Sequence, residues 1–249
     1  MTGYRAAAEE GNAKAQYNLG VFYRDGTGLP QDYAAAALWF GRAAEQDLAD
    51  AENSLGILYS DGHGVPQDYA EAVRWFQLAA EHGYVRAQFN LAVMYDNGRG
   101  VSQDDMEAAH WYLLAAQQRY PNAQYVVGTM YASGRGVPQD DIEAAMWLRL
   151  AAEQGVAPAQ NNLGIMYLLG RGLMRDDEQA VRWLRSAAEQ GLAEAQKNYG
   201  LVYFAGDHGL PQDFGQAARW FRLAAAQGDP TAAQLLPIAE AKLHETSER

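Results

Sequence analysis

The 249-residue chain contains no cysteine, which excludes disulfide bonds, thiol catalysis and cysteine-ligated metal sites. Basic residues are also few, since 19 lysines and arginines stand against 31 acidic residues and leave a formal net charge of −12. Nucleic acids and anionic membrane surfaces both attract clustered basic side chains, so neither is an expected partner. No apolar run approaches the ~18 residues of a membrane-spanning helix. The 49% of apolar and 20% of charged residues predict a folded protein, and the negative charge suits a monomer or a partner with a basic patch. We expect it neither to bind nucleic acid nor to insert into a membrane.

Tryptophan recurs with a period of 36 residues. It occupies positions Trp39, Trp75, Trp111, Trp147 and Trp183, and then Trp220. The last position comes one residue late because the loop "GDHG" at 206–209 is one residue longer than "GRG" at 170–172. A fixed period of this length is the signature of stacked structural repeats. We therefore expect a partial repeat at 1–7, a degenerate half repeat with a polar cap at 225–249, and six full repeats at 8–43, 44–79, 80–115, 116–151, 152–187 and 188–224.

Each repeat carries the pattern of two helices. In the segment that starts at Ala13, apolar residues such as Leu19 and Phe22 recur at the spacing of one helical face. A second segment follows, in which Trp75 and Phe76 belong to the apolar stripe of repeat two. Every second segment is preceded by an aspartate suited to N-capping, at Asp32, Asp68, Asp104, Asp140, Asp176 and Asp213.

Further residues mark where the second helix starts and ends. A glutamate three residues after the cap, as at Glu71, is expected to reach back to the N-terminus in a capping box. Gly83 and its equivalents are expected to end the helix in the left-handed conformation, and Asp47 and Arg119 interrupt that glycine column.

Glycine also lies inside the first helix of most repeats, at Gly20, Gly56, Gly128, Gly164 and Gly200, with Ala92 in the remaining one. A glycine in a helix interior costs about 1 kcal/mol relative to alanine. We infer that the second helix passes too closely for a larger side chain. The other half of this contact is predicted to be the small residues Ala36, Ala72, Ala108, Ala144, Ala180 and Ala217.

A lone hairpin cannot bury both of its faces, whereas stacked hairpins can. The expected fold is therefore all-α, a right-handed α-solenoid with a C-terminal capping helix. The unit "A-x-A-Q-x-N-L-G-x-x-Y-x-x-G-x-G-V-P-Q-D-Y-x-x-A-x-x-W-F" resembles the Sel-one-like repeat (SLR) family, a branch of the tetratricopeptide-repeat superfamily. The resemblance implies an adaptor that holds a partner protein on its concave face.

The same resemblance leaves the compartment open, because bacterial members occur both in the envelope and inside the cell. Tyr4 occupies the position of Leu148, so the chain begins in the middle of a repeat. We expect the parent chain to continue upstream, where a targeting segment would lie.

The loop between the two helices begins with paired glycines, as in "GRGVP" at 134–138. Such a loop at a helix N-terminus is able to cradle a phosphate. Here an aspartate occupies that N-terminus and repels anions, so we interpret the loop as a turn. Arg99, Arg135 and Arg171 recur in these loops, and pairing with the N-cap aspartates is favoured over a basic ridge for an acidic partner.

No catalytic or metal-binding pattern is apparent. The histidines, His63, His82, His110, His208 and His244, have no second histidine or carboxylate at a typical metal-ligand spacing. The motifs G-x-S-x-G and H-E-x-x-H are both missing. We predict a protein without catalytic residues, bound metal or cofactor, in which the tryptophans are core residues and not a binding ladder.

In tetratricopeptide-like stacking, the first helix of each hairpin lines the concave groove. By this resemblance, the predicted partner-binding residues are Tyr17, Arg86, Phe89, Asn90, Tyr125, Asn162, Leu168, Leu169, Lys197, Asn198 and Phe204. Leu168, Leu169 and Phe204 would form an exposed apolar contact site without a role in folding, unless the superhelix buries them itself. Asn90, Asn162 and Asn198 would hold a peptide backbone or a C-terminal carboxylate, or would instead bond to the adjacent hairpin.

Three functions are compatible with these features. The first is a scaffold that binds a protein or peptide in the groove. The second is an inhibitor or immunity protein, whose negative charge would speed the capture of a basic enzyme or toxin. The third is a hydrolase acting on cell-wall fragments or β-lactams, which the missing nucleophile and base disfavour. We predict the first.

Overall fold

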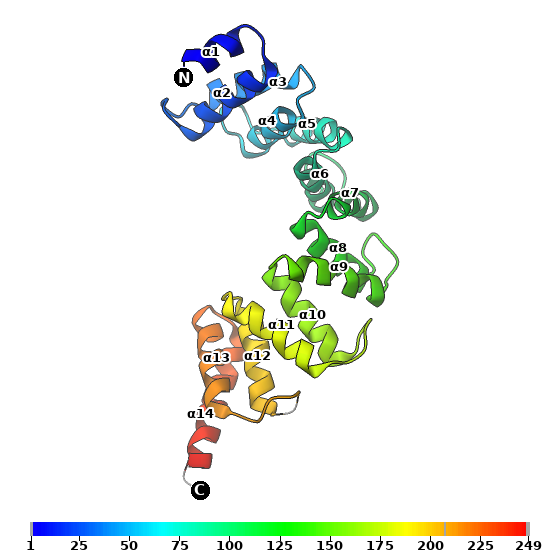
Figure 1. Ribbon diagram of the computed structural model, residues 1–249, viewed down its shortest axis with the longest axis vertical. Helices are drawn as coiled ribbons and strands as arrows, with labels where there is room; N and C mark the ends of the chain where they lie inside the picture. Colours follow the sequence, from blue (N-terminus) through cyan, green and yellow to red (C-terminus); the bar gives the residue numbers. More distant parts are fainter. Residues whose placement is uncertain (1, 207, 248–249) are drawn as a thin grey trace. The chain divides into compact units, whose positions relative to one another are not determined.

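The computed structural model describes residues 2–206 and 208–247, and all its regular elements within those ranges are α-helices (Figure 1). The contacts divide the chain into two compact units, residues 1–120 and 121–249. The first unit holds α1 (Thr2–Glu9), α2 (Ala13–Asp25), α3 (Tyr33–Ala44), α4 (Ala49–Asp61), α5 (Tyr69–Glu81), α6 (Val85–Asn97) and α7 (Asp105–Gln117). The second holds α8 (Pro121–Ser133), α9 (Asp141–Glu153), α10 (Ala157–Leu169), α11 (Asp177–Glu189), α12 (Ala193–Ala205), α13 (Phe214–Ala226) and α14 (Pro230–Ser247).

Even-numbered helices are the first helix of each predicted hairpin, and the following odd-numbered helices are the second. Within each hairpin, the even-numbered helix packs on the odd-numbered helix after it. Within each unit, that odd-numbered helix also packs on the first helix of the next hairpin. The helical repeat inferred from the tryptophan period is thereby confirmed. Trp39 and Trp220 are buried in this packing, as expected for core residues, whereas the other tryptophans of the column are half-buried, at Trp75, Trp111, Trp147 and Trp183. Asp207, in the longer loop "GDHG", lies outside the described residues.

The aspartates that precede the odd-numbered helices cap them as predicted. Asp68 Oδ1, for example, accepts hydrogen bonds from the backbone N–H groups of Ala70 and Glu71, at 2.9 and 3.1 Å. The capping box is wrong, however, because the backbone N–H of Asp68 donates to the carbonyl of Tyr59 at 3.0 Å. Glu71 pairs instead with Arg74. The bond to Tyr59 ties the start of the second helix to the end of the first.

The interior glycines lie at the predicted close approach of the two helices, but the main contact differs from the prediction. A Cβ on Gly56 would lie 2.7 Å from carbons of the Phe76 ring and 3.2 Å from the carbonyl oxygen of Ala72. At Gly128, the nearest atom belongs to Leu148. The glycines therefore accommodate the large residue that follows each tryptophan, more than the small alanine column.

The second glycine of three loops has a role that the hairpin alone does not explain. A Cβ on Gly172 would overlap the backbone of Asp141, which begins α9 in the preceding repeat. Gly64 and Gly100 approach Tyr33 and Tyr69 in the same way. The loop is thus a turn, as predicted, and also a contact between neighbouring repeats.

Candidate functional site

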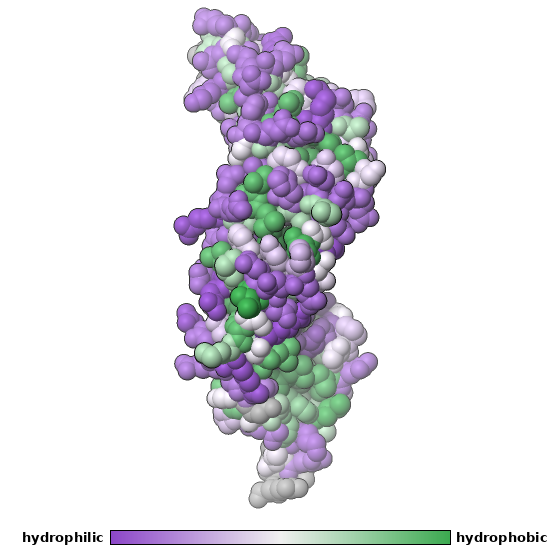
Figure 2. Space-filling model, turned by 90° about the vertical axis from the view of Figure 1, so that its right-hand side faces the viewer, coloured by the Kyte–Doolittle hydropathy of each residue, from purple (hydrophilic) through white to green (hydrophobic). Residues whose placement is uncertain are grey.

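Two neighbouring pockets lie on the even-numbered helices of the second unit. The first, of about 260 Å³, lies between α10 and α12 and is lined by the apolar side chains of Ile165, Leu168, Leu201 and Phe204, with Asn198 beside them. The second, of about 290 Å³, lies between α8 and α10, where Ile165 lines it too. Its polar lining includes Thr129, Ser133, Asn162 and Arg171. Figure 2 shows apolar side chains gathered over the lower part of the molecule, which belongs to this second unit.

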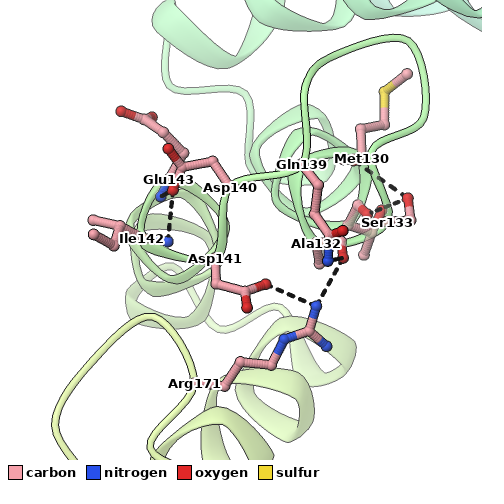
Figure 3. A network of polar contacts seen from close by, with 10 residues as sticks. Met130, Ala132, Ser133, Gln139, Asp140, Asp141, Ile142, Glu143 and Arg171 are labelled. Carbon is pink, nitrogen blue, oxygen red and sulfur yellow. Dashed lines mark hydrogen bonds and ion pairs between the residues drawn. The ribbon is translucent and has the colours of Figure 1, made fainter.

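Arg171 is held in place at the edge of the second pocket (Figure 3). Its Nη2 atom lies 2.7 Å from Asp141 Oδ1 and donates to the carbonyl of Ala132 at 2.8 Å. The expected pairing of Arg171 with the N-cap Asp176 is therefore wrong. The loop that carries Arg171 stacks on the preceding repeat, where the guanidinium reaches the first residue of α9. This contact with the guanidinium lowers the pKa of the Asp141 carboxyl.

Two of the predicted groove asparagines bond to the adjacent hairpin, which is one of the two alternatives. Asn90 Nδ2 donates to Asn53 Oδ1, and Asn198 Nδ2 donates to Asn161 Oδ1, each at 2.9 Å. The second of these bonds positions Asn198 beside the first pocket. Asn162 lines the second pocket.

The predicted aromatic anchors of the first unit pack on rings of the second half of their own hairpin. The Tyr17 ring lies 5.6 Å from that of Phe40. Phe89 packs between two tyrosine rings, at 5.4 Å from Tyr112 and 5.1 Å from Tyr120. All are half-buried or buried, and their aromatic surface is largely used in packing.

The remaining predicted residues differ in their surroundings. Tyr125, in α8, packs against the core formed by α9 and α10, and burial raises the pKa of its phenol. Lys197 Nζ lies 3.9 Å from Asp229 Oδ2 and is mostly buried. Arg86 is exposed on α6.

Of the predicted apolar cluster, Leu168 and Phe204 line the first pocket together, whereas Leu169 lies apart. Phe204 packs against the rings of Phe214 and Phe221, at 5.3 and 6.2 Å, so the expectation that it has no role in folding is wrong. Leu168 is half-buried at the first pocket, whereas Leu169 is 70% exposed and lines neither pocket.

A ladder of buried glutamine side chains was missed from the sequence. Gln160 Nε2 donates to the carbonyl of Ala152 at 3.0 Å, and Gln160 Oε1 accepts from Gln190 Nε2 at 2.7 Å. The sequence pattern that could have revealed this ladder is a glutamine in the first helix of a repeat and a second glutamine 30 residues later, after the second helix. This pair recurs through the chain. Glu52 in α4 and His82 after α5 stand at two of these positions, with His82 Nδ1 3.1 Å from Glu52 Oε2. The structure thus brings a histidine beside a carboxylate 30 residues away in the sequence, which no typical metal-ligand spacing indicates.

The Sel1 repeat profile matches six consecutive segments, at residues 13–48, 49–84, 85–120, 121–156, 157–192 and 193–229. The chain belongs to the Sel1 repeat family. The matched repeats have the predicted period, but each begins at the first residue of an even-numbered helix. The family is generally a non-catalytic protein-interaction scaffold, and repeats of this kind typically bind proteins.

Solved structures of bacterial Sel1 repeat proteins support this assignment. A Sel1 repeat protein from Oxalobacter formigenes is 38% identical, with a TM-score of 0.79 over 94% of this chain and 67% of the other. A protective antigen of uropathogenic Escherichia coli strains, which displays an SLR fold, is 34% identical with a TM-score of 0.74 over 96% of this chain. The chain spans 59% of that antigen's length.

A more distant likeness shows the fold alone. An immunity protein from Pseudomonas aeruginosa is 20% identical, with a TM-score of 0.51 over 86% of this chain and 80% of the other. Among curated proteins, no match was found.

Within residues 2–206 and 208–247, no helix is both long and apolar enough to cross a bilayer.

Proposed function

We propose that this Sel1 repeat chain is a non-catalytic scaffold that binds a protein or peptide partner across α8, α10 and α12. The observation that carries the proposal is the pair of neighbouring pockets that share Ile165. Apolar side chains of a partner would enter the pocket between α10 and α12, since a concave apolar lining with a few polar groups is typical of binding sites. Binding would require no cofactor.

The polar groups beside the pockets supply orientation. Asn198 and Arg171 are each fixed by bonds to a neighbouring hairpin, so little side-chain entropy remains to be lost when a partner carbonyl or carboxylate binds. A guanidinium that is already placed makes strong charge-assisted hydrogen bonds to such oxygens.

The test is affinity capture with a matched pair of variants. Leu201, on α12, is 38% exposed in the first pocket, and Leu223, on α13, is 42% exposed outside both pockets. Leu201→Asp is expected to lose a partner that Leu223→Asp retains, provided that circular dichroism shows equal helicity. Retention of the partner by both folded variants would contradict the proposal.

A narrower candidate is an inhibitor or immunity-type protein that neutralises a basic enzyme or toxin. The net charge of −12 favours it, because long-range attraction accelerates association with a cationic partner. If this candidate holds, the association rate of the captured partner falls as salt rises. A rate independent of salt would contradict the candidate while leaving the scaffold proposal intact.

A further inference from the structure

Repeat two and the turn that precedes it depart from the other repeats at three positions at once. The turn before α4 carries Asp47 where glycine stands at 11, 83, 155, 191 and 228. In α4, Glu52 replaces the buried glutamine found at 16, 88, 124, 160 and 196. At the end of α5, His82 replaces the glutamine found at 46, 118, 154, 190 and 227. All three changes introduce side chains that ligate metal ions.

The three side chains converge although they come from different elements. One ligand atom of each of Asp47, Glu52 and His82 lies within 4.8 Å of the other two. His82 Nδ1 and Glu52 Oε2 are already 3.1 Å apart. For comparison, ligand atoms that each lie ~2.0–2.1 Å from a tetrahedral zinc ion are separated from one another by about 3.3 Å.

The surroundings of Glu52 favour a cation over a simple hydrogen-bonded pair. Its side chain is only 1% exposed, and a buried carboxylate is costly unless its charge is compensated. The glutamine pairs of the other repeats make the equivalent bond without any charge, so repeat two carries an electrostatic cost that its neighbours avoid.

We propose that Asp47, Glu52 and His82 bind a divalent transition-metal ion, with Zn²⁺ as the best match. One imidazole nitrogen and two carboxylate oxygens suit Zn²⁺, whereas Ca²⁺ and Mg²⁺ prefer sites made entirely of oxygen. The ion neutralises both carboxylates and accepts the neutral form of the imidazole. Asp47 and His82 are exposed, so the ion enters from solvent and completes its coordination with water.

Such an ion would act as a clamp within the first unit. It joins the turn after α3, the helix α4 and the end of α5, and so connects repeat one to both helices of repeat two. Binding to the folded state alone stabilises that state by a free energy that rises with the logarithm of the metal concentration.

The test uses the full chain without an affinity tag, stripped of metal with a chelator. Isothermal titration with ZnCl₂ is expected to give one Zn²⁺ per chain, together with a rise in Tm. The variant Asp47→Gly/Glu52→Gln/His82→Gln restores the residues that the other repeats use, so it is expected to fold. It should bind Zn²⁺ more than about tenfold more weakly and lose the Tm rise. His110→Gln removes an exposed histidine elsewhere on the first unit and should leave binding unchanged.

Two results would overturn the proposal. One is Zn²⁺ affinity in the folded triple variant equal to that of the parent chain. The other is a parent chain that takes up no Zn²⁺, or prefers Ca²⁺ or Mg²⁺ in competition. Neither result bears on partner binding at α10 and α12, which belong to the other unit.

Discussion

The ring of Phe76 packs directly onto the α-carbon of Gly56, where a Cβ would lie only 2.7 Å from two ring carbons. The same relationship joins Gly20 to Phe40 in the repeat before it. The helix thus accepts the roughly 1 kcal/mol cost of an interior glycine because a large apolar residue occupies the space of its missing side chain.

Gly56→Ala should therefore destabilise the protein. Alanine gains about 1 kcal/mol in helix propensity, but overpacking a tight core costs typically 1–3 kcal/mol. We expect a net loss of about 1 kcal/mol in the free energy of unfolding, measured by urea denaturation. Gly41, in α3, is the matched control because a Cβ there meets no atom within 4 Å. Gly41→Ala should stabilise by about 0.5–1 kcal/mol, and stabilisation by both variants would refute the packing argument.

The N-cap aspartates make a second prediction. Asp140 Oδ1 accepts from the N–H groups of Ile142 and Glu143, at 2.8 and 3.1 Å (Figure 3). Asp140→Ala should lower the free energy of unfolding by about 1 kcal/mol, because two donors lose their partner. Asp140→Asn keeps a side-chain acceptor and should lose much less. Equal losses would mean that the negative charge, and not the hydrogen bond, stabilises α9.

Arg119 supplies a third prediction, of opposite sign. It occupies the position where most other repeats place glycine and has a φ of 65°, in the left-handed region. Glycine adopts this conformation without the strain that a Cβ causes. Arg119→Gly should therefore raise the free energy of unfolding by roughly 0.5–1 kcal/mol, whereas Arg119→Ala, which keeps the Cβ, should not. Thermal unfolding of the two variants measures the difference.

The phenol of Tyr84 is expected to make the free energy of unfolding depend on pH in the alkaline range. Burial, assisted by the nearby carboxylate of Asp50, raises the pKa of Tyr84 to about 12, and Arg86 opposes the shift. The unfolded phenol has a pKa of about 10, so its contribution to stability is present below pH ~10 and is lost as the pH rises toward ~12. Tyr84→Phe removes this contribution.

Urea unfolding at several alkaline pH values checks the sign of that effect. Between pH ~10 and ~12, the free energy of unfolding should fall less steeply for Tyr84→Phe than for the parent chain. Parallel curves would show that the Tyr84 phenol titrates alike in the folded and unfolded states.

The repeat architecture was predictable because each repeat carries the same residue pattern, so every copy supports the same helix assignment. The 36-residue tryptophan period, the aspartate caps and the interior glycines are local signals, and the helices follow them. Contacts between repeats were harder to foresee. Arg171 pairs with Asp141, 30 residues earlier, because the loop stacks on the preceding hairpin, and no local rule indicates that direction.

The site was predicted only in part for the same reason. Leu168, Asn198 and Phe204 do line a pocket, as does Asn162 in its neighbour. Phe89, however, is held between a ring of the following helix and a ring of the turn after it, which a single-helix pattern does not show. The convergence of Asp47, Glu52 and His82 likewise depends on how α3, α4 and α5 pack.

The most direct measurement is site-specific photo-crosslinking of the captured partner. A photoreactive phenylalanine analogue replaces Leu201 on α12 in one sample and Leu223 on α13 in the other, two leucines of similar exposure. If the pockets of the even-numbered helices bind the partner, irradiation yields a crosslinked complex from position 201 and none from position 223. A crosslink from position 223 alone would contradict the account and place binding on the odd-numbered helices.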